Sequence, residues 1–419
     1  MKRYEHYSSV SNLLTNEIPS HWKTNRNRVF LRPKFVSVGQ DADKYSLLSL
    51  TTNGIILRDI ESGKGKFPKD FDAYQVVEPN DIVFCLFDVD ETPRTVGLSS
   101  LNGMLTGAYD AFSISHAVNP QYVNYYYTAV DDIKALRPYY TGLRKVVKKD
   151  KFMAISVPLP PIEEQNKIVA YLNKRITLIE NCKCQREREL QTLNELKQAE
   201  IASVVTRGLN PNVPMKDSGQ IQFGEIPAHW DSVKMKYCFT QRSEKGFPNE
   251  PVLCATQSKG VIPQSLYENR VVVVNKGFEG LKLVKVGDFV ISLRSFQGGI
   301  EYAYYQGIIS AAYTILTPKD VRNSQYFKYL FKSHPFIQLL QTCVTGIREG
   351  QNINYGVLGN NFIPIPPIEE QNAIVEYIEA KTNKIDTMVE ALKAEIDRLT
   401  EYKQRLISDV VTGQINVQD

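Results

Sequence analysis

Apolar residues recur along residues 375–410 at the spacing of a long amphipathic helix. They occupy the d position of every heptad, and β-branched residues are frequent at the a position. This pattern predicts a coiled-coil helix, which needs a partner along its length to bury its apolar seam. The predicted seam of this helix comprises Ile378, Ile385, Val389, Leu392, Ile396, Leu399, Leu406 and Val410.

A second segment with the same pattern lies 206 positions earlier in the chain. Its predicted seam comprises Val169, Leu172, Ile176, Ile179, Leu190, Leu193 and Val204. The charged residues Lys183, Arg186, Lys197 and Glu200 interrupt this seam, so its pairing is expected to be less regular than that of a simple coiled coil. The partner of each helix is expected to be the other, packed antiparallel. A helix of about 40 residues is about 60 Å long, so the pair could hold two domains at a fixed distance.

The ends of the second helix carry typical boundary residues. Pro366 and Pro367 precede Ile368-Glu-Glu-Gln, which places two carboxylates at the positive end of the helix dipole. Gly413 follows the last heptad and fits a helix exit.

The repeat extends over almost the whole chain. Residues 16–22 return as 224–230, and residues 141–144 return as 345–348, so the shift varies between 208 and 204. Residues 158–210 align with 364–416 at a constant shift of 206, with 22 of 53 positions identical. Loops tolerate insertions, whereas a long helix keeps its register. Each half is therefore expected to be a variable globular domain followed by a helix of fixed length.

The globular segments mix strand and helix patterns. Buried strands are predicted at 81–87, 270–274 and 288–293, and helices at 121–130 and 325–332, with glycines between them. The predicted fold class is α+β: two similar α/β domains joined by two long helices that form an antiparallel coiled coil, with an internal pseudo-two-fold repeat. The expected boundaries are 1–157 for the first domain, 158–206 for the first helix, 207–223 for a linker, 224–363 for the second domain, 364–413 for the second helix and 414–419 for a tail.

Composition restricts the class of protein. The 419 residues are 42% hydrophobic and 23% charged, as in globular proteins. The chain starts without the apolar region of a secretory signal, and it lacks an apolar run long enough to span a membrane. A cytoplasmic protein is expected, so its six cysteines are interpreted as reduced thiols; a redox or metal role for Cys182 and Cys184 is the less favoured alternative. The net charge of +4 allows a polyanionic partner without requiring one.

Catalytic motifs are missing from the sequence. It contains neither a nucleophile elbow, a HExxH helix nor a Walker A loop, and it lacks the glycine-rich and Pro-Pro-aromatic motifs of a methyltransferase. No metal site is predicted. His21 and Trp22 match His229 and Trp230 in the repeat, and both pairs are interpreted as packing residues in preference to a contact surface.

Binding remains as the predicted chemistry. Lysines near predicted turns suit phosphate groups, and arginine, glutamine and asparagine can bond to the edges of guanine or adenine. A surface lysine or arginine is more often simply solvated, so the prediction is stronger for the clusters than for single residues. The candidate DNA-binding residues are Lys64, Lys66, Lys69, Arg94, Arg144, Lys145, Lys148, Lys149, Lys259, Lys276, Arg294, Gln297, Arg348, Gln351 and Asn352.

Two motifs connect the chain with a known family. Residues 158–165 and 364–371 share the pattern Pro-x-Pro-Pro-Ile-Glu-Glu-Gln, which resembles the entry to the central helices of type I restriction–modification specificity subunits. Residues 206–219, followed by 224–230, resemble the linker between the two halves of those proteins. The resemblance covers nearly the whole chain.

The resemblance implies two target-recognition domains, each contacting one half of a split target in double-stranded DNA. The helices would set the spacer and dock two copies of the modification subunit, and motor or restriction subunits would join through the assembled complex. The chain itself would be non-catalytic and hold no cofactor. S-adenosylmethionine, ATP and Mg would belong to the partner subunits, and no membrane is involved.

Two alternatives stay open at this stage. One is a coiled-coil scaffold or decoy of the same plan that does not recognise DNA. The other is a self-contained modification enzyme, which the missing motifs and the chain length disfavour.

Overall fold

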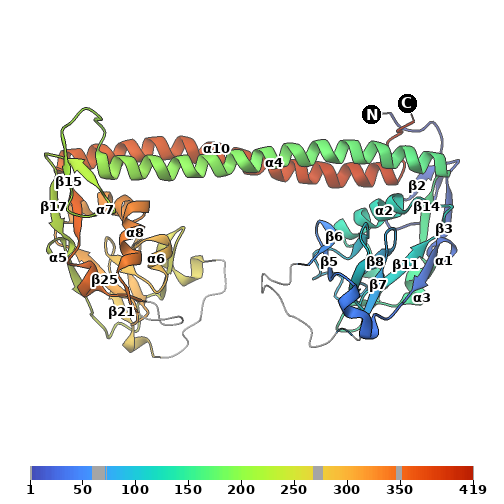
Figure 1. Ribbon diagram of the computed structural model, residues 1–419, viewed down its shortest axis with the longest axis horizontal. Helices are drawn as coiled ribbons and strands as arrows, with labels where there is room; N and C mark the ends of the chain where they lie inside the picture. The colour runs from blue at the N-terminus through green and yellow to red at the C-terminus, as the bar shows by residue number, and fades with distance from the viewer. Residues whose placement is uncertain (1, 59–70, 72, 268–276, 346–351, 419) are drawn as a thin grey trace. The chain divides into compact units, whose positions relative to one another are not determined.

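The computed structural model describes residues 2–58, 71, 73–267, 277–345 and 352–418. The chain divides into two compact units. The first comprises Met1–Arg186 with Ala394–Asp419, and the second comprises Glu187–Lys393. Each unit therefore contains one globular domain together with part of each long helix (Figure 1).

The first globular domain is built from short antiparallel strands. Its central sheet has the order β4-β11-β8-β9, and two-stranded ladders join β1 to β2, β3 to β14, β5 to β6, β7 to β10 and β12 to β13. The strands are β1 Tyr7–Ser9, β2 Glu17–Pro19, β3 Lys23–Arg26, β4 Leu31–Lys34, β5 Leu48–Thr51, β6 Gly54–Leu57, β7 Tyr74–Val77, β8 Ile82–Phe84, β9 Val96–Leu98, β10 Gly103–Thr106, β11 Asp110–Ile114, β12 Tyr140–Thr141, β13 Val146–Val147 and β14 Ser156–Leu159. The helices are α1 Asn27–Phe30, α2 Pro120–Asp132, α3 Lys149–Ala154 and the long α4 Ile162–Arg207.

The second globular domain repeats this plan. Its central sheet has the corresponding order β18-β25-β22-β23, again antiparallel throughout. The strands are β15 Met215–Asp217, β16 Glu225–Pro227, β17 Asp231–Lys234, β18 Phe239–Arg242, β19 Leu253–Thr256, β20 Gly260–Pro263, β21 Lys282–Val284, β22 Phe289–Ile291, β23 Glu301–Tyr302, β24 Gly307–Ile309, β25 Thr314–Pro318, β26 Val344–Thr345, β27 Asn352–Ile353 and β28 Phe362–Ile365. The helices are α5 Met235–Cys238, α6 Ser295–Gly298, α7 Ser324–Leu330, α8 His334–Thr342, α9 Tyr355–Leu358 and the long α10 Ile368–Val411.

The predicted α+β fold with its internal repeat is confirmed. The helices predicted at 121–130 and 325–332 correspond to α2 and α7, and the strands predicted at 81–87 and 288–293 correspond to β8 and β22. The strand predicted at 270–274 lies outside the described residues. The expected linker 207–223 contains the strand β15, which pairs with β16 beyond the linker's expected end.

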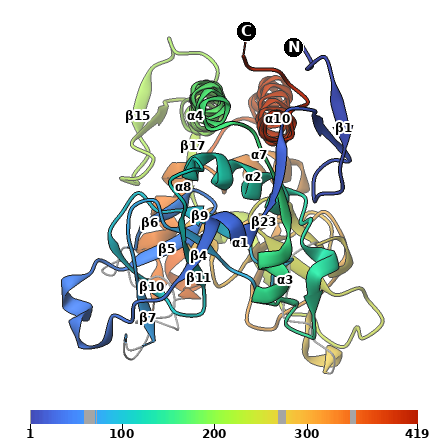
Figure 2. The same cartoon turned by 90° about the vertical axis from the view of Figure 1, so that its right-hand side faces the viewer.

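The long helices run antiparallel in each unit. In the first unit, Lys403 of α10 donates to Glu180 of α4 at 2.7 Å, and Arg186 of α4 donates to Glu395 at 3.1 Å. In the second unit, Lys197 of α4 donates to Asp386 of α10 at 2.6 Å. Across the three pairs, the residue number in α10 falls as the residue number in α4 rises, as expected for antiparallel helices. Figure 2 shows the two helices side by side. Two charged interruptions predicted in the seam, Arg186 and Lys197, therefore bond to the facing helix.

Every predicted seam residue is buried or half-buried. The helices also carry a second apolar face, which the heptad pattern did not single out. Ile168, Ile407 and Val411 join the core of the first domain, and Ile201, Val205 and Ile374 join the core of the second. The helices are therefore part of both domain cores, unlike a coiled coil that only pairs with itself.

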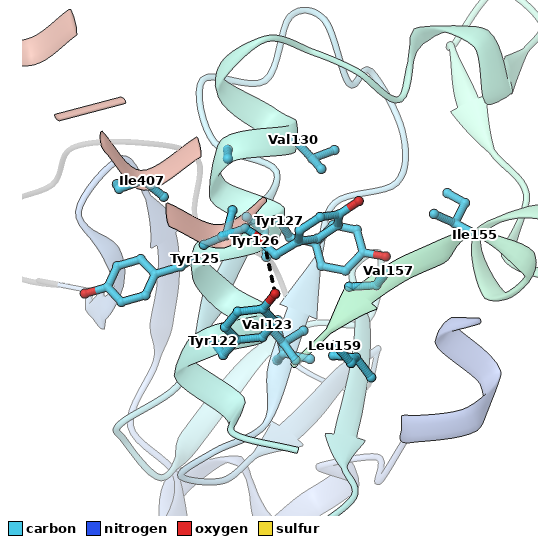
Figure 3. Packing of buried hydrophobic residues seen from close by; sticks show 14 of the residues in the cluster. Tyr122, Val123, Tyr125, Tyr126, Tyr127, Val130, Ile155, Val157, Leu159 and Ile407 are labelled. Carbon is cyan, nitrogen blue, oxygen red and sulfur yellow. Dashed lines mark hydrogen bonds between the residues drawn. The ribbon is translucent and has the colours of Figure 1, made fainter. Parts of the chain in front are cut away.

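The helix α2 forms the contact between the first domain and the long helices. It lies between the central sheet and α4 with α10 (Figure 2), and Tyr122, Tyr126 and Tyr127 on it are fully buried. Figure 3 shows these tyrosines packed with Ile155, Val157 and Leu159 on one side and Ile407 on the other. The hydroxyl of Tyr122 lies within hydrogen-bond distance of the Pro158 and Val411 carbonyl oxygens, at 2.9 and 3.1 Å.

A carboxylate at the start of each long helix holds the His-Trp pair of its domain. Glu164 Oε2 lies 2.9 Å from His21 Nε2, and the Trp22 indole N–H donates to Glu164 Oε1 at 3.1 Å. Likewise, Glu370 Oε2 lies 2.7 Å from His229 Nε2 and accepts from the Trp230 indole at 2.9 Å. The two tryptophans are therefore buried packing residues, whereas the histidines are about half exposed, and both members of each pair contact the second glutamate of the Ile-Glu-Glu-Gln motif.

Candidate nucleic-acid interface

The structure places nine of the fifteen candidate DNA-binding residues. Lys64, Lys66, Lys69, Lys276, Arg348 and Gln351 lie outside the described residues. In the first domain, the described candidates are Arg94, Arg144, Lys145, Lys148 and Lys149. In the second domain, they are Lys259, Arg294, Gln297 and Asn352.

Arg144 and Lys145 stand at the tip of the β12–β13 hairpin. The turn uses two left-handed residues, Gly142 with φ +77° and Lys145 with φ +46°, and the Lys145 N–H donates to the Gly142 carbonyl at 3.1 Å. The Arg144 side chain is 74% exposed, and its guanidinium lies 3.5 Å from the Asp88 carboxylate. The hairpin therefore presents an arginine that solvent or a polyanion can reach.

Acidic residues of the loop after β8 hold this hairpin in place. Lys145 Nζ lies 3.4 Å from Asp90 and 3.3 Å from Glu91. Asp90 also accepts from Arg137 at 3.0 Å and from Tyr140 at 2.9 Å. Hydrogen bonds from Arg137 and Tyr140, and the positive charge nearby, lower the pKa of Asp90. This network orients the basic tip but neutralises part of its charge, so exposed Arg144 is the stronger candidate for a base contact.

Lys148 and Lys149 stand at the start of α3, directly after the hairpin. Lys148 is exposed and occupies the N-cap position of the helix. Lys149 Nζ lies 3.1 Å from Asp110 and 5.3 Å from the centre of the Phe112 ring. Arg144, Lys145, Lys148 and Lys149 therefore lie on the β12–β13 hairpin and at the start of the adjoining helix α3.

Arg94, unlike Arg144, has a largely buried side chain. Its side chain is 18% exposed, and its guanidinium pairs with Asp131 at 3.1 Å and Asp132 at 2.9 Å on α2. Asp131 also accepts from the Thr95 hydroxyl at 2.6 Å. These contacts favour a structural role for Arg94 between the sheet and α2. The sequence alone could not show whether Arg94 is paired in this way or exposed to solvent.

The second domain brings three candidates onto neighbouring segments. Lys259 lies in the β19–β20 turn, Arg294 precedes α6, and Gln297 lies within α6; all three are exposed. A Cβ atom added to Gly298 would lie 2.8 Å from the side chain of Gln257, so the end of α6 touches the β19–β20 turn. Asn352, also exposed, belongs to the separate β26–β27 hairpin.

Among the residues that the structure describes, no three His, Cys, Asp or Glu side chains gather where they could hold a metal ion. The six cysteines are free thiols. None of the helices in that described part of the chain combines sufficient length with a sufficiently apolar sequence to cross a membrane.

Comparison with known proteins connects this geometry with a family. Residues 227–398 match the family model of the type I restriction modification DNA specificity domain. The type I restriction enzyme MjaVIII specificity subunit of Methanocaldococcus jannaschii is 28% identical over 296 residues. The chain is therefore similar to type I restriction enzyme specificity subunits over about two thirds of its length.

A further specificity subunit is similar to this chain. The putative MjaX specificity subunit of the same organism is 25% identical over 285 residues. These matches cover 65% of this chain for MjaX and 67% for MjaVIII, but only 62% and 66% of the two relatives themselves, less than two thirds of their length.

A solved structure shares the fold of this chain. It comes from work on complex assembly and conformational transition of the type I R-M system. The match has a TM-score of 0.67 at 16% identity and covers 95% of this chain and 99% of the other.

Proposed function

We propose that this chain is the DNA specificity subunit of a type I restriction–modification complex and recognises a bipartite target in double-stranded DNA. The observation that carries the proposal is that the same antiparallel sheet occurs twice, in β4-β11-β8-β9 and in β18-β25-β22-β23. Each domain presents exposed cationic or amide side chains on its hairpins and short helices, with Arg144 in the first and Arg294 in the second. Two similar domains suit two half-sites.

The proposed role is non-catalytic. The modification subunit would supply S-adenosylmethionine and methylate adenine, two copies of it would dock on the long helices, and motor subunits would supply ATP and Mg. Methylation of a base in a duplex requires that the base be flipped into a pocket, which the partner would provide. Incubating the chain with labelled methyl donor and DNA, without any partner, should give no DNA methylation; methylation by the chain alone would favour the self-contained enzyme instead.

The decisive experiment combines a methylation map with a domain exchange. Modified adenines are mapped across the genome with and without the gene, which gives the target sequence. Residues 23–150 are then replaced by the matching segment of another specificity subunit. Only one half of the target should change, whereas a change in both halves would contradict independent recognition by the two domains.

A scaffold or decoy that does not recognise DNA is the competing function. Gel shifts of the chain assembled with its modification subunit distinguish the two. Sequence-dependent shifts support the specificity subunit, and a complex that assembles without shifting any duplex supports the scaffold.

A further inference from the structure

Lys332, two residues after the end of α7, bonds to three separate elements of the second domain. Its ammonium donates to the Gly298 carbonyl at 2.9 Å, to the Gln257 carbonyl at 3.3 Å and to Glu301 Oε1 at 2.6 Å. Gly298 ends α6, Gln257 begins the β19–β20 turn, and Glu301 lies in β23. One side chain therefore joins α6, the turn and the edge of the central sheet.

The anionic partner of Lys332 is deeply buried. Glu301 is 2% exposed, and its Oε2 atom has no hydrogen-bond partner. The Lys332 side chain is 29% exposed, so the pair lies mostly out of water. A buried carboxylate is strongly unfavourable when its counter-charge is removed, so Glu301 holds Lys332 in this position.

Two glycines allow the close approach that Lys332 secures. Gly299 has φ +85°, and a Cβ atom there would lie 2.2 Å from the Phe331 carbonyl oxygen. At Gly298, a Cβ atom would lie 2.8 Å from Gln257 Cδ. The end of α6 therefore lies directly against the backbone of Phe331, just after α7, and against the side chain of Gln257 in the turn.

The segments joined in this way carry the exposed Lys259, Arg294 and Gln297. We propose that Lys332 is a positioning residue for DNA recognition: together with Glu301 it fixes α6 and the β19–β20 turn as one surface, from which these three side chains contact a half-site. Hydrogen bonds to base edges require side chains in fixed positions, and a supporting ion pair below the surface supplies that order. This inference rests on the proposed function.

In the first domain an ion pair also connects the sheet to a helix, but the positions of the cation and the anion are reversed. There the cation, Arg94, precedes β9, and the anions, Asp131 and Asp132, lie on α2. In the second domain, the anion lies on β23 and the cation follows α7. The two domains thus use unrelated residues for the connection, which permits each one to be altered without the other.

The test measures half-site discrimination by the full chain assembled with its modification subunit. The domain exchange first shows which half-site each domain recognises. Fluorescence anisotropy then gives the Kd for a duplex with the mapped target and for duplexes with one base changed in either half-site. Lys332→Met, and the double variant Glu301→Gln with Lys332→Met, which leaves no buried charge, should lose about tenfold in discrimination at the second-domain half-site. Discrimination at the first-domain half-site should not change, and Lys332→Arg should restore part of the loss.

Lys319→Met is the matched control. Lys319 is exposed and follows β25, at the end of that strand that is farther from α6. It should leave both half-sites unchanged. The proposal is overturned if the double variant keeps full discrimination at both half-sites, or if it loses both equally. A wild-type complex without any sequence preference would instead contradict the proposed function itself.

Discussion

The hydroxyl of Tyr122 lies 3.1 Å from the carbonyl oxygen of Val411, a residue 289 positions later at the end of α10. Tyr326 takes the same place in the second domain, where its hydroxyl lies 2.8 Å from the Val205 carbonyl near the end of α4. Each domain is thus fastened to the end of the helix that follows the other domain. Burial raises the pKa of both hydroxyls well above the ordinary value, so they remain protonated donors.

Tyr122→Phe should destabilise the first unit. The change removes one buried hydrogen-bond donor and keeps the ring, so the expected loss is about 1 kcal/mol in the free energy of unfolding. Chemical denaturation measures it, with Tyr402→Phe as the control because Tyr402 is 45% exposed on α10. Equal stability of the two variants would mean that the bond to the helix end contributes nothing.

Glu164→Gln should lower the stability at neutral pH and make it depend less on pH. Burial alone would raise the pKa of Glu164, but hydrogen bonds from Tyr4, His21 and Trp22 outweigh it and lower the pKa below its ordinary value. A lowered pKa in the folded state stabilises the fold above the unfolded value of 4.5, and this contribution is lost as the pH falls. Unfolding followed from pH 7 to pH 3 should show a flatter dependence for Glu164→Gln than for the wild type.

Glu163→Gln serves as the control for this measurement. Glu163 is the neighbouring residue, it is exposed, and the substitution removes the same charge. A matching change in both variants would show that the effect comes from the helix dipole and not from the buried cluster.

Glu301 should give the opposite dependence on pH. Burial raises its pKa from 4.5 to about 7, although Lys332, the charged partner that contacts it, lowers the pKa in part. Between these values the folded state binds the proton more tightly than the unfolded state, so stability falls as the pH rises. The span corresponds to about 3 kcal/mol at most. Glu301→Gln should abolish this fall in denaturation experiments between pH 4.5 and pH 7; an unchanged curve would contradict it.

Single substitutions at the interface should distinguish phosphate contacts from base contacts. Lys148→Ala should weaken binding to all duplexes alike and make the slope of log K against log salt shallower by about 1. Gln297→Ala should relax specificity at one position by about 1–3 kcal/mol and leave the salt slope unchanged. Binding titrations at several salt concentrations, on cognate and altered duplexes, separate the two results.

Local periodicity explains why the long helices could be predicted. Val389 and Ile396 lie seven residues apart, so the sequence itself contains the signal for their shared face. The contact of Ile407 with the first domain, in contrast, depends on a partner far away in the chain, which no local pattern reveals. The role of Glu164 was missed for the same reason, since Trp22 is 142 positions away.

The candidate interface was less predictable because a cation's role depends on its neighbours. Arg94 and Arg144 both follow turn residues in the sequence, yet the first pairs with α2 and the second is largely exposed. Lys332 gave no signal, as a single lysine after a helix is common. Its importance follows from three acceptors on three elements, which only the folded chain brings together.

Lengthening both helices should lengthen the unread spacer of the target. Each long helix contributes residues to both units, and Arg186 faces Glu395 close to the point where α4 and α10 pass from one unit to the other. Inserting four residues after Arg186 and four after Lys393 adds about one turn, or about 6 Å, to both helices at facing positions. If paired helices set the distance between the two domains, the methylation map should show the same two half-sites with a longer spacer.

The control for this experiment inserts the same four residues after Asn53, in the turn between β5 and β6. That turn lies within the first domain and belongs to neither long helix, so the insertion leaves the length of both helices, and with it the spacer, unchanged. A longer spacer in the helix variant alone supports the helices as the element that sets it, because both insertions add the same chain length. An unchanged spacer with intact methylation would contradict that role, since the added turn would then have no effect on the distance between the half-sites.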